Sequence, residues 1–190
     1  MIKKFNNWET TKAFGSFQAL PKGAYICKIM KAEVIGDWGI KVYYDVTEGD
    51  HKDFWSNDYR SQTREDKIWR GTFLLYLPTE DGSPKDENTK RRFRTFTDHL
   101  EDVNPGYHFD WDEQKWKGKM FGGLFRIRQS QKNDKVYNNL EPNAFTSFEN
   151  IRNGNYTLPD DYMISNNTTT QTSPGNTGFT DVEGSNDLPF

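Results

Sequence analysis

The sequence predicts a mainly β protein, a small β-barrel with one main helix that is followed by a polar, acidic tail. Three observations support this fold class. Short segments rich in Val, Ile, Tyr and Phe recur with turn residues between them. Only residues 89–101 place apolar side chains convincingly at helical spacing. No regular strand–helix alternation occurs, so the sheet is expected to be antiparallel.

The first two predicted strands form a hairpin, after an irregular arm over residues 1–20. Residues 24–35 are rich in Tyr, Ile and Val, and the Gly-containing turn 36–39 leads to a second strand at 40–46. Side chains alternate across a strand, so one row of the second strand faces the core. The expected core row is Ile40, Val42, Tyr44 and Val46, and the opposite row is Lys41, Tyr43 and Asp45.

The remaining elements complete a barrel. A short strand is predicted at 52–55, a polar loop with a helical turn at 56–67, and a strand at 72–77. The helix over 89–101 is followed by a hairpin whose long second strand covers 116–129. In that strand Gly122 and Gly123 predict a bulge, Phe121, Phe125 and Ile127 share one face, and Leu124, Arg126 and Arg128 share the other. Five or six strands with one helix between them predict a Greek-key barrel resembling the OB-fold.

The composition changes at residue 160. Residues 165–176 are almost wholly small and polar, which predicts a disordered tail over 160–190 behind a folded domain over 1–159. The tail holds five of the 28 acidic residues and none of the 25 basic ones. The domain therefore carries a formal charge of +2 and the tail −5. The tail ends in a motif that predicts capture of its terminal ring and carboxylate by a partner protein, Asp187, Leu188, Pro189 and Phe190.

The composition also narrows the function class. Aromatic residues make up 15% of a chain with only 33% hydrophobic residues, so some rings are expected at the surface. The single cysteine, Cys27, lies in a predicted strand and is expected to be a buried thiol. No apolar run approaches 18 residues and no secretory leader is recognised, which predicts a cytoplasmic protein without membrane contact. His51, His99 and His108 lack metal-ligand spacing, and no catalytic motif occurs, so neither an enzyme nor a cofactor is expected.

The terminal motif resembles the tip of bacterial-type single-stranded-DNA-binding proteins, which recruit replication and repair partners through it. The body is similar instead to phage-encoded members of replication modules, regarded as single-stranded-DNA-binding OB-folds. This similarity covers roughly residues 17–159. It rests on the segments 20–25, 89–93, 104–107 and 118–123. The resemblance implies a non-catalytic, phage-encoded protein of replication or recombination in the host cytoplasm. Its implied partners are single-stranded DNA and a helicase, polymerase, recombinase or nuclease, with no metal or cofactor.

Binding unpaired strands requires a basic groove and rings on which bases stack. We select residues at outward-facing strand positions and in neighbouring loops. The strand residues could instead belong to a solvated sheet face, and the rings in the loops could instead plug the ends of the barrel. The basic cluster at 90–94 is interpreted as the solvated face of the helix. The candidate nucleic-acid-binding residues are Lys28, Lys31, Lys41, Tyr43, Trp55, Tyr59, Arg60, Trp69, Arg70, Arg126 and Arg128.

Two other functions remain open from the sequence. The first is a protein-interaction adaptor, such as an inhibitor of a host replication enzyme, with all aromatic residues internal. The second is a metal-dependent nuclease that uses Asp110, Asp112 and Glu113, although acids are ordinary in a predicted hairpin turn. The sequence leaves open the oligomeric state, including a homo-oligomer, the preference for DNA or RNA, the size of the binding site and the tail's partner.

Overall fold

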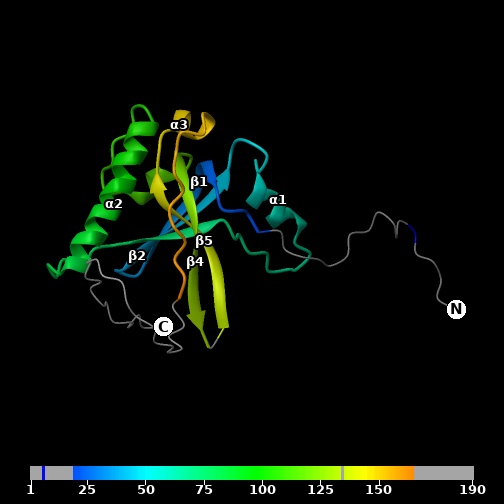
Figure 1. The fold of residues 1–190 in the computed structure, drawn as a ribbon, viewed down its shortest axis with the longest axis horizontal. Coiled ribbons are helices and arrows are strands. Elements are labelled where there is room, and N and C mark those ends of the chain that lie inside the picture. The colour runs from blue at the N-terminus through cyan, green and yellow to red at the C-terminus, as the bar shows by residue number, and fades with distance from the viewer. Residues whose placement is uncertain (1–5, 7–18, 134, 165–190) are drawn as a thin grey trace, which may run out of the picture.

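The computed structural model describes residues 6, 19–133 and 135–164, and these form one five-stranded antiparallel sheet with short helices around it (Figure 1). The order of the strands in the sheet is β3-β2-β1-β4-β5. The strands are β1 (Ala24–Ile35), β2 (Gly39–Val46), β3 (Thr72–Tyr76), β4 (Met120–Lys132) and β5 (Lys135–Phe145). The helices are α1 (Phe54–Ser61), α2 (Pro84–Val103), α3 (Phe148–Arg152) and the 3₁₀ turn η1 (Glu113–Trp116).

The connections between the strands form a Greek key. Strands β1, β2 and β3 follow one another as antiparallel neighbours, and β4 returns after a long connection containing α2 to pair with β1. In the described residues, β3 and β5 stand at opposite ends of the strand order and do not pair with each other. The mainly β class and the antiparallel sheet are therefore confirmed, whereas a closed barrel is not.

The hydrophobic core lies between the sheet and α2. The predicted core row of β2 is buried, and Phe121 and Phe125 of β4 are fully buried. Helix α2 lies against one side of the sheet (Figure 1). Its Phe96 ring contacts the rings of Trp116 and Phe121 edge-on, with centroids 5.4 and 6.0 Å away. Cys27 is a buried free thiol, and burial raises its pKa well above the usual value.

The predicted strand at 52–55 is wrong, because α1 begins there. The buried Asp45 carboxylate accepts hydrogen bonds from the backbone N–H groups of Trp55 and Ser56 at 2.9 and 3.0 Å. These are donors that the first turn of a helix leaves unpaired. Helix α1 is thus capped by a residue of β2, a contact that no local pattern reveals.

Helix α2 begins five residues earlier than predicted, at Pro84. The Ser83 hydroxyl accepts a hydrogen bond from the Asp86 N–H at 3.1 Å, and Pro84 occupies the first turn, where its missing N–H costs nothing. The Asp86 carboxylate is buried and accepts from the N–H groups of Thr79 and Glu80. The sequence predicts a surface loop over residues 80–84, and the last residue of that loop, Pro84, belongs to the helix instead.

The predicted hairpin before β4 is also wrong. Its turn forms η1, whose Trp116 is fully buried, and β4 begins only at Met120. The register shift lies between Leu124 and Phe125 rather than at the paired glycines. Glycine is needed at position 122 for a different reason. A Cβ there would lie 2.2 Å from the Thr146 carbonyl oxygen.

Residues 161–164 extend the folded body beyond the predicted boundary at 159. Tyr162 forms a parallel bridge with Arg128, with the Gln129 N–H donating to the Tyr162 carbonyl at 2.8 Å. The Asp161 carboxylate forms an ion pair with Lys22 at 2.9 Å and accepts from the Ile127 N–H at 2.9 Å. The terminal motif at 187–190 and most of the predicted arm over 1–20 lie outside the described residues.

His99 makes the fold sensitive to acid. Its Nε2 accepts a hydrogen bond from the Gly122 N–H at 3.0 Å, so the bound ring is neutral. Burial lowers the pKa of His99 to about 4, and nearby Asp102 acts weakly in the opposite direction. Unfolding exposes the ring and restores a pKa of about 6.5. The contribution of the neutral ring to the free energy of unfolding is complete above about pH 6.5 and is lost as the pH falls toward about 4.

We therefore expect this residue to account for about 3 kcal/mol of acid destabilisation. Urea unfolding at several pH values between about 4 and 7 measures it. His99→Gln keeps an acceptor without titrating, so its unfolding free energy should vary less with pH. His108→Gln, at an exposed position, is the control and should follow the unmodified protein. Equal pH dependence in His99→Gln and the unmodified protein would contradict the assignment.

Candidate nucleic-acid interface

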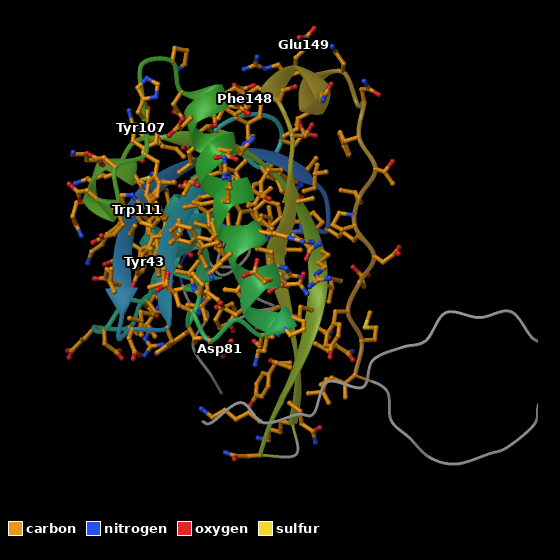
Figure 2. The ribbon with its side chains drawn as sticks, turned by 90° about the vertical axis from the view of Figure 1, so that its left-hand side faces the viewer. Tyr43, Asp81, Tyr107, Trp111, Phe148 and Glu149 are labelled. Atoms are coloured by element: carbon orange, nitrogen blue, oxygen red, sulfur yellow. The ribbon has the colours of Figure 1, made fainter. Side chains whose placement is uncertain are left out.

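The outer face of β1 and β2 carries a compact cluster of charged and aromatic side chains, which we call the β2 cluster: Lys31, Glu33, Lys41 and Tyr43. In the sheet, Lys31 lies opposite Tyr43 and Glu33 lies opposite Lys41. The Lys41 and Lys31 ammonium groups lie 5.0 and 5.8 Å from the Tyr43 ring centroid. Figure 2 shows Tyr43 on the side of the molecule formed by the first two strands.

Hydrogen bonds fix the charge states of the β2 cluster. The Tyr43 hydroxyl donates to Glu33 Oε2 at 2.7 Å, and the Lys31 ammonium donates to the other carboxylate oxygen. The bond from Lys31, followed by that from Tyr43, lowers the pKa of Glu33. Burial, followed by the bond to Glu33, raises the pKa of Tyr43 to about 12. At neutral pH Glu33 is thus a carboxylate and Tyr43 a neutral phenol.

The neighbouring positions extend this face. Lys28 is exposed on β1 and makes no ion pair with any described residue. On β3, Leu74 lies opposite Lys41 and Tyr76 lies opposite Gly39, and both side chains are exposed. The Tyr76 ring lies 6.0 Å from that of Trp38 in the β1–β2 turn. Leu74, Tyr76 and Trp38 were not selected from the sequence, although alternation with buried Phe73 and Leu75 would have placed Leu74 and Tyr76 outward.

A second group, which we call the hairpin cluster, is built around two outward-facing arginines of β4. It consists of Arg126, Arg128, Glu141 and Tyr162. The Arg126 guanidinium donates to Glu141 Oε1 from Nε at 3.2 Å and from Nη2 at 3.0 Å. Arg128 Nη1 donates to Glu141 Oε2 at 3.5 Å, and its guanidinium carbon lies 5.8 Å from the Tyr162 ring centroid. The two predicted arginines are thus brought together, but they share one carboxylate.

The candidates around α1 divide into buried and exposed groups. Trp55 is only 6% exposed and packs edge-on against Tyr44 in the core, so its ring cannot stack on a base. Trp69 is half-buried, and its indole N–H donates to the carbonyls of Tyr44 and Gly71. Tyr59 is exposed, with the Lys67 ammonium 5.7 Å from its ring centroid.

The two predicted arginines at this end differ. Arg60 is exposed and makes no ion pair with a described residue. Arg70 forms an ion pair with Asp58 at 2.8 Å. Arg60 lies in α1, and Arg70 lies just before β3, where its carbonyl accepts from the Thr72 N–H at 2.8 Å. Among the sequence-predicted residues, Trp55 is therefore unavailable for stacking, whereas Tyr43 lies on an outer sheet face beside two lysines.

Trp111 is a further exposed ring that sequence reasoning did not select. It is 83% exposed, with φ at 66°, an unusual backbone conformation for a bulky residue. Its ring is stacked against Phe93 with centroids 6.5 Å apart and an angle of 14° between the planes. Its flanking acids, Asp110 and Asp112, both form ion pairs with Lys115.

The described residues contain no group of three or more His, Cys, Asp or Glu side chains placed to hold a metal ion. In the same part of the chain, no helix is long and apolar enough to span a bilayer. Comparison with protein-family models found no match, and no curated protein matches the sequence.

Proposed function

We propose that the protein binds single-stranded nucleic acid, and DNA in particular, without catalysing a reaction on it. The observation that carries this proposal is the Tyr43 ring on an outer sheet face between the ammonium groups of Lys31 and Lys41. Sequence-independent binding of single strands combines rings that stack on bases with cations that contact phosphates, each stacked base contributing about 1–3 kcal/mol.

The strand order supports the same function. A Greek-key sheet with its helix between the third and fourth strands is the arrangement we associate with an OB-fold, a partly open barrel. OB-folds bind oligonucleotides on the face of their second and third strands and at the loops between strands one and two and strands four and five. Lys41, Tyr43, Leu74 and Tyr76 occupy this face, and Trp38 occupies the first of these loops.

We further propose the biological role suggested by the resemblance to phage proteins. The folded body coats single strands during phage replication or recombination in the host cytoplasm, and the C-terminal tip recruits a helicase, polymerase, recombinase or nuclease. The support for recruitment is the terminal sequence itself, because the motif lies outside the described residues.

A protein-interaction adaptor is the second candidate. The expectation that all aromatic residues of an adaptor are internal is not met, but the 83% exposed Trp111 suits a protein interface. Trp is enriched at the centres of protein interfaces, and this ring is held against Phe93 at the surface. Tryptophan fluorescence separates the two functions, because bases stacked on Trp38 quench emission on addition of oligo-dT but not of duplex. An adaptor would show neither response.

Binding to single strands should weaken steeply with salt. With about four phosphate contacts, the logarithm of the affinity should fall with the logarithm of salt concentration at a slope of about −3. Fluorescence anisotropy of labelled oligo-dT at several salt concentrations measures this slope, and a duplex of the same length is the control. Absence of binding to oligo-dT, or binding that does not depend on salt, would contradict the proposal.

Tyr43→Leu should weaken binding to oligo-dT because it removes the ring but keeps an apolar side chain. The expected loss is about 1–2 kcal/mol, or roughly 5- to 30-fold in affinity. Tyr156→Leu changes an exposed tyrosine outside both clusters and should leave the affinity unchanged. If both variants bind as the unmodified protein does, Tyr43 is not a stacking residue.

Removal of residues 165–190 should tighten binding to oligo-dT at low salt. These residues carry three acidic and no basic side chains, which compete with phosphate for the cationic face. Ending the chain after Ile164 preserves the contacts of Asp161 and Tyr162 with β4. The gain in affinity should decrease as salt rises, because screening weakens the competition. Weaker or unchanged binding by the shortened chain would argue against competition, and loss of partner recruitment is expected independently.

A further inference from the structure

The hairpin cluster places one negative charge between two positive ones. Arg126 and Glu141 lie directly opposite each other on β4 and β5, and Arg128 is the next outward-facing residue of β4. The side chains of Arg126, Arg128 and Glu141 are 16%, 34% and 24% exposed, so solvent reaches all three. Their summed formal charge is +1 rather than the +2 of the two arginines alone.

The arginines retain hydrogen-bonding capacity for another anion. A guanidinium has five N–H donors, and Glu141 receives two bonds from Arg126 and one from Arg128. The remaining N–H groups have the fork geometry that suits phosphate. A phosphate that approaches them is attracted by two cations and repelled by the carboxylate between them.

The β2 cluster repeats the arrangement. Glu33 accepts hydrogen bonds from Lys31 and Tyr43 on the same face that carries Lys41. Each of the two cationic clusters on the outer face therefore contains one carboxylate that is bonded to the groups expected to meet the nucleic acid. Glu141 is the clearer case, because among the described residues its side chain bonds only to the two arginines.

We propose that Glu141 is an internal competitor for phosphate that limits the affinity of the hairpin cluster for single strands. This inference rests on the proposed function. When a backbone phosphate contacts Arg126 or Arg128, it displaces hydrogen bonds already made to Glu141. The free energy gained from each new bond is therefore offset in part by the loss of an existing one. The carboxylate thus weakens binding and favours release of the strand.

A purely structural Glu141 would have the opposite effect. If its role were to hold the two guanidiniums in position for phosphate, then its removal would loosen them and weaken binding. Glu141→Gln distinguishes the two roles, because glutamine keeps the side-chain length and one acceptor oxygen but removes the charge. The local formal charge rises from +1 to +2.

The experiment measures oligo-dT affinity by anisotropy for the unmodified protein, Glu141→Gln and Asp98→Asn. Asp98→Asn is the matched control, because it also removes one carboxylate bonded to an arginine, Arg94, but on α2. We expect Glu141→Gln to bind about 3- to 10-fold more tightly at about 50 mM salt, and the gain to shrink as salt rises. Its salt slope should become more negative by about 0.7. Asp98→Asn should bind as the unmodified protein does.

Equal or weaker binding by Glu141→Gln, or a gain that does not depend on salt, would overturn the inference. Thermal unfolding checks each variant, and Glu141→Met, similar in length and uncharged, replaces Glu141→Gln if that variant is unstable. Failure of the proposed function has a different outcome, in which the unmodified protein does not bind oligo-dT and both proposals fall. If the unmodified protein binds, Tyr43→Leu weakens binding and Glu141→Gln gives no gain, only the role of Glu141 is rejected.

Discussion

The packing of Tyr44 in the core determines how the rest of β2 is used. Its side chain is almost completely buried, with ring centroids 5.4 Å from Phe125 and 5.9 Å from both Phe73 and Phe121. Burial raises the pKa of its phenol well above the usual value, so the ring remains neutral. Because neighbouring side chains in a strand point to opposite faces, this placement directs both Tyr43 and Asp45 away from the core.

The two outward neighbours of Tyr44 have different consequences. Tyr43 remains partly exposed and organises the charged β2 cluster. Asp45 is covered by α1 and caps its first turn. Capping places Trp55 against Tyr44 and close to Gly71, where a Cβ would lie 2.3 Å from the indole. The core, the first helix and the candidate interface therefore share one strand register, and a slip by one residue would exchange the buried and exposed rows.

Local patterns in the sequence predicted the elements that have a clear periodicity. β2 was predicted closely because its apolar and polar residues alternate, and β1 and β3 because runs rich in apolar and aromatic residues are bounded by turn residues. Strand β5 has no such alternation. Its first five residues, 135–139, are exposed and mostly polar, and the strand forms because it pairs with β4. Helix α1 and the bridge at Tyr162 depend on Asp45, Lys22 and Ile127, which are distant in sequence.

The same distinction applies to the candidate site. Lys41 and Tyr43 were selected because alternation places both on one face, and the structure brings Lys31 beside them. Trp55 was selected as a ring in a polar segment, but only the tertiary contact with Asp45 decides that it faces inward. Glu33 and Glu141 were not selected at all, because an acidic residue on a strand carries no local sign of its partners. Cross-strand pairing places them in the β2 cluster and the hairpin cluster.

Each of the two carboxylates, Glu33 and Glu141, would affect strand binding in two opposing ways. The relative size of these two effects decides whether the carboxylate strengthens or weakens binding. A bonded carboxylate holds an arginine in place and so reduces the entropy lost on binding, but it also lowers the attraction for phosphate. In the hairpin cluster, Arg126 is already restricted by its half-buried position in the sheet, and Arg128 contacts Tyr162. The ordering that Glu141 adds is greatest at Arg126, whose side chain is only 16% exposed, and smaller at Arg128, which is 34% exposed. The full negative charge, in contrast, acts on every phosphate within about 8 Å at physiological salt. The proposed role of Glu141 requires that repulsion exceed ordering, in which case the outer face would combine cations that attract a strand with carboxylates that favour its release.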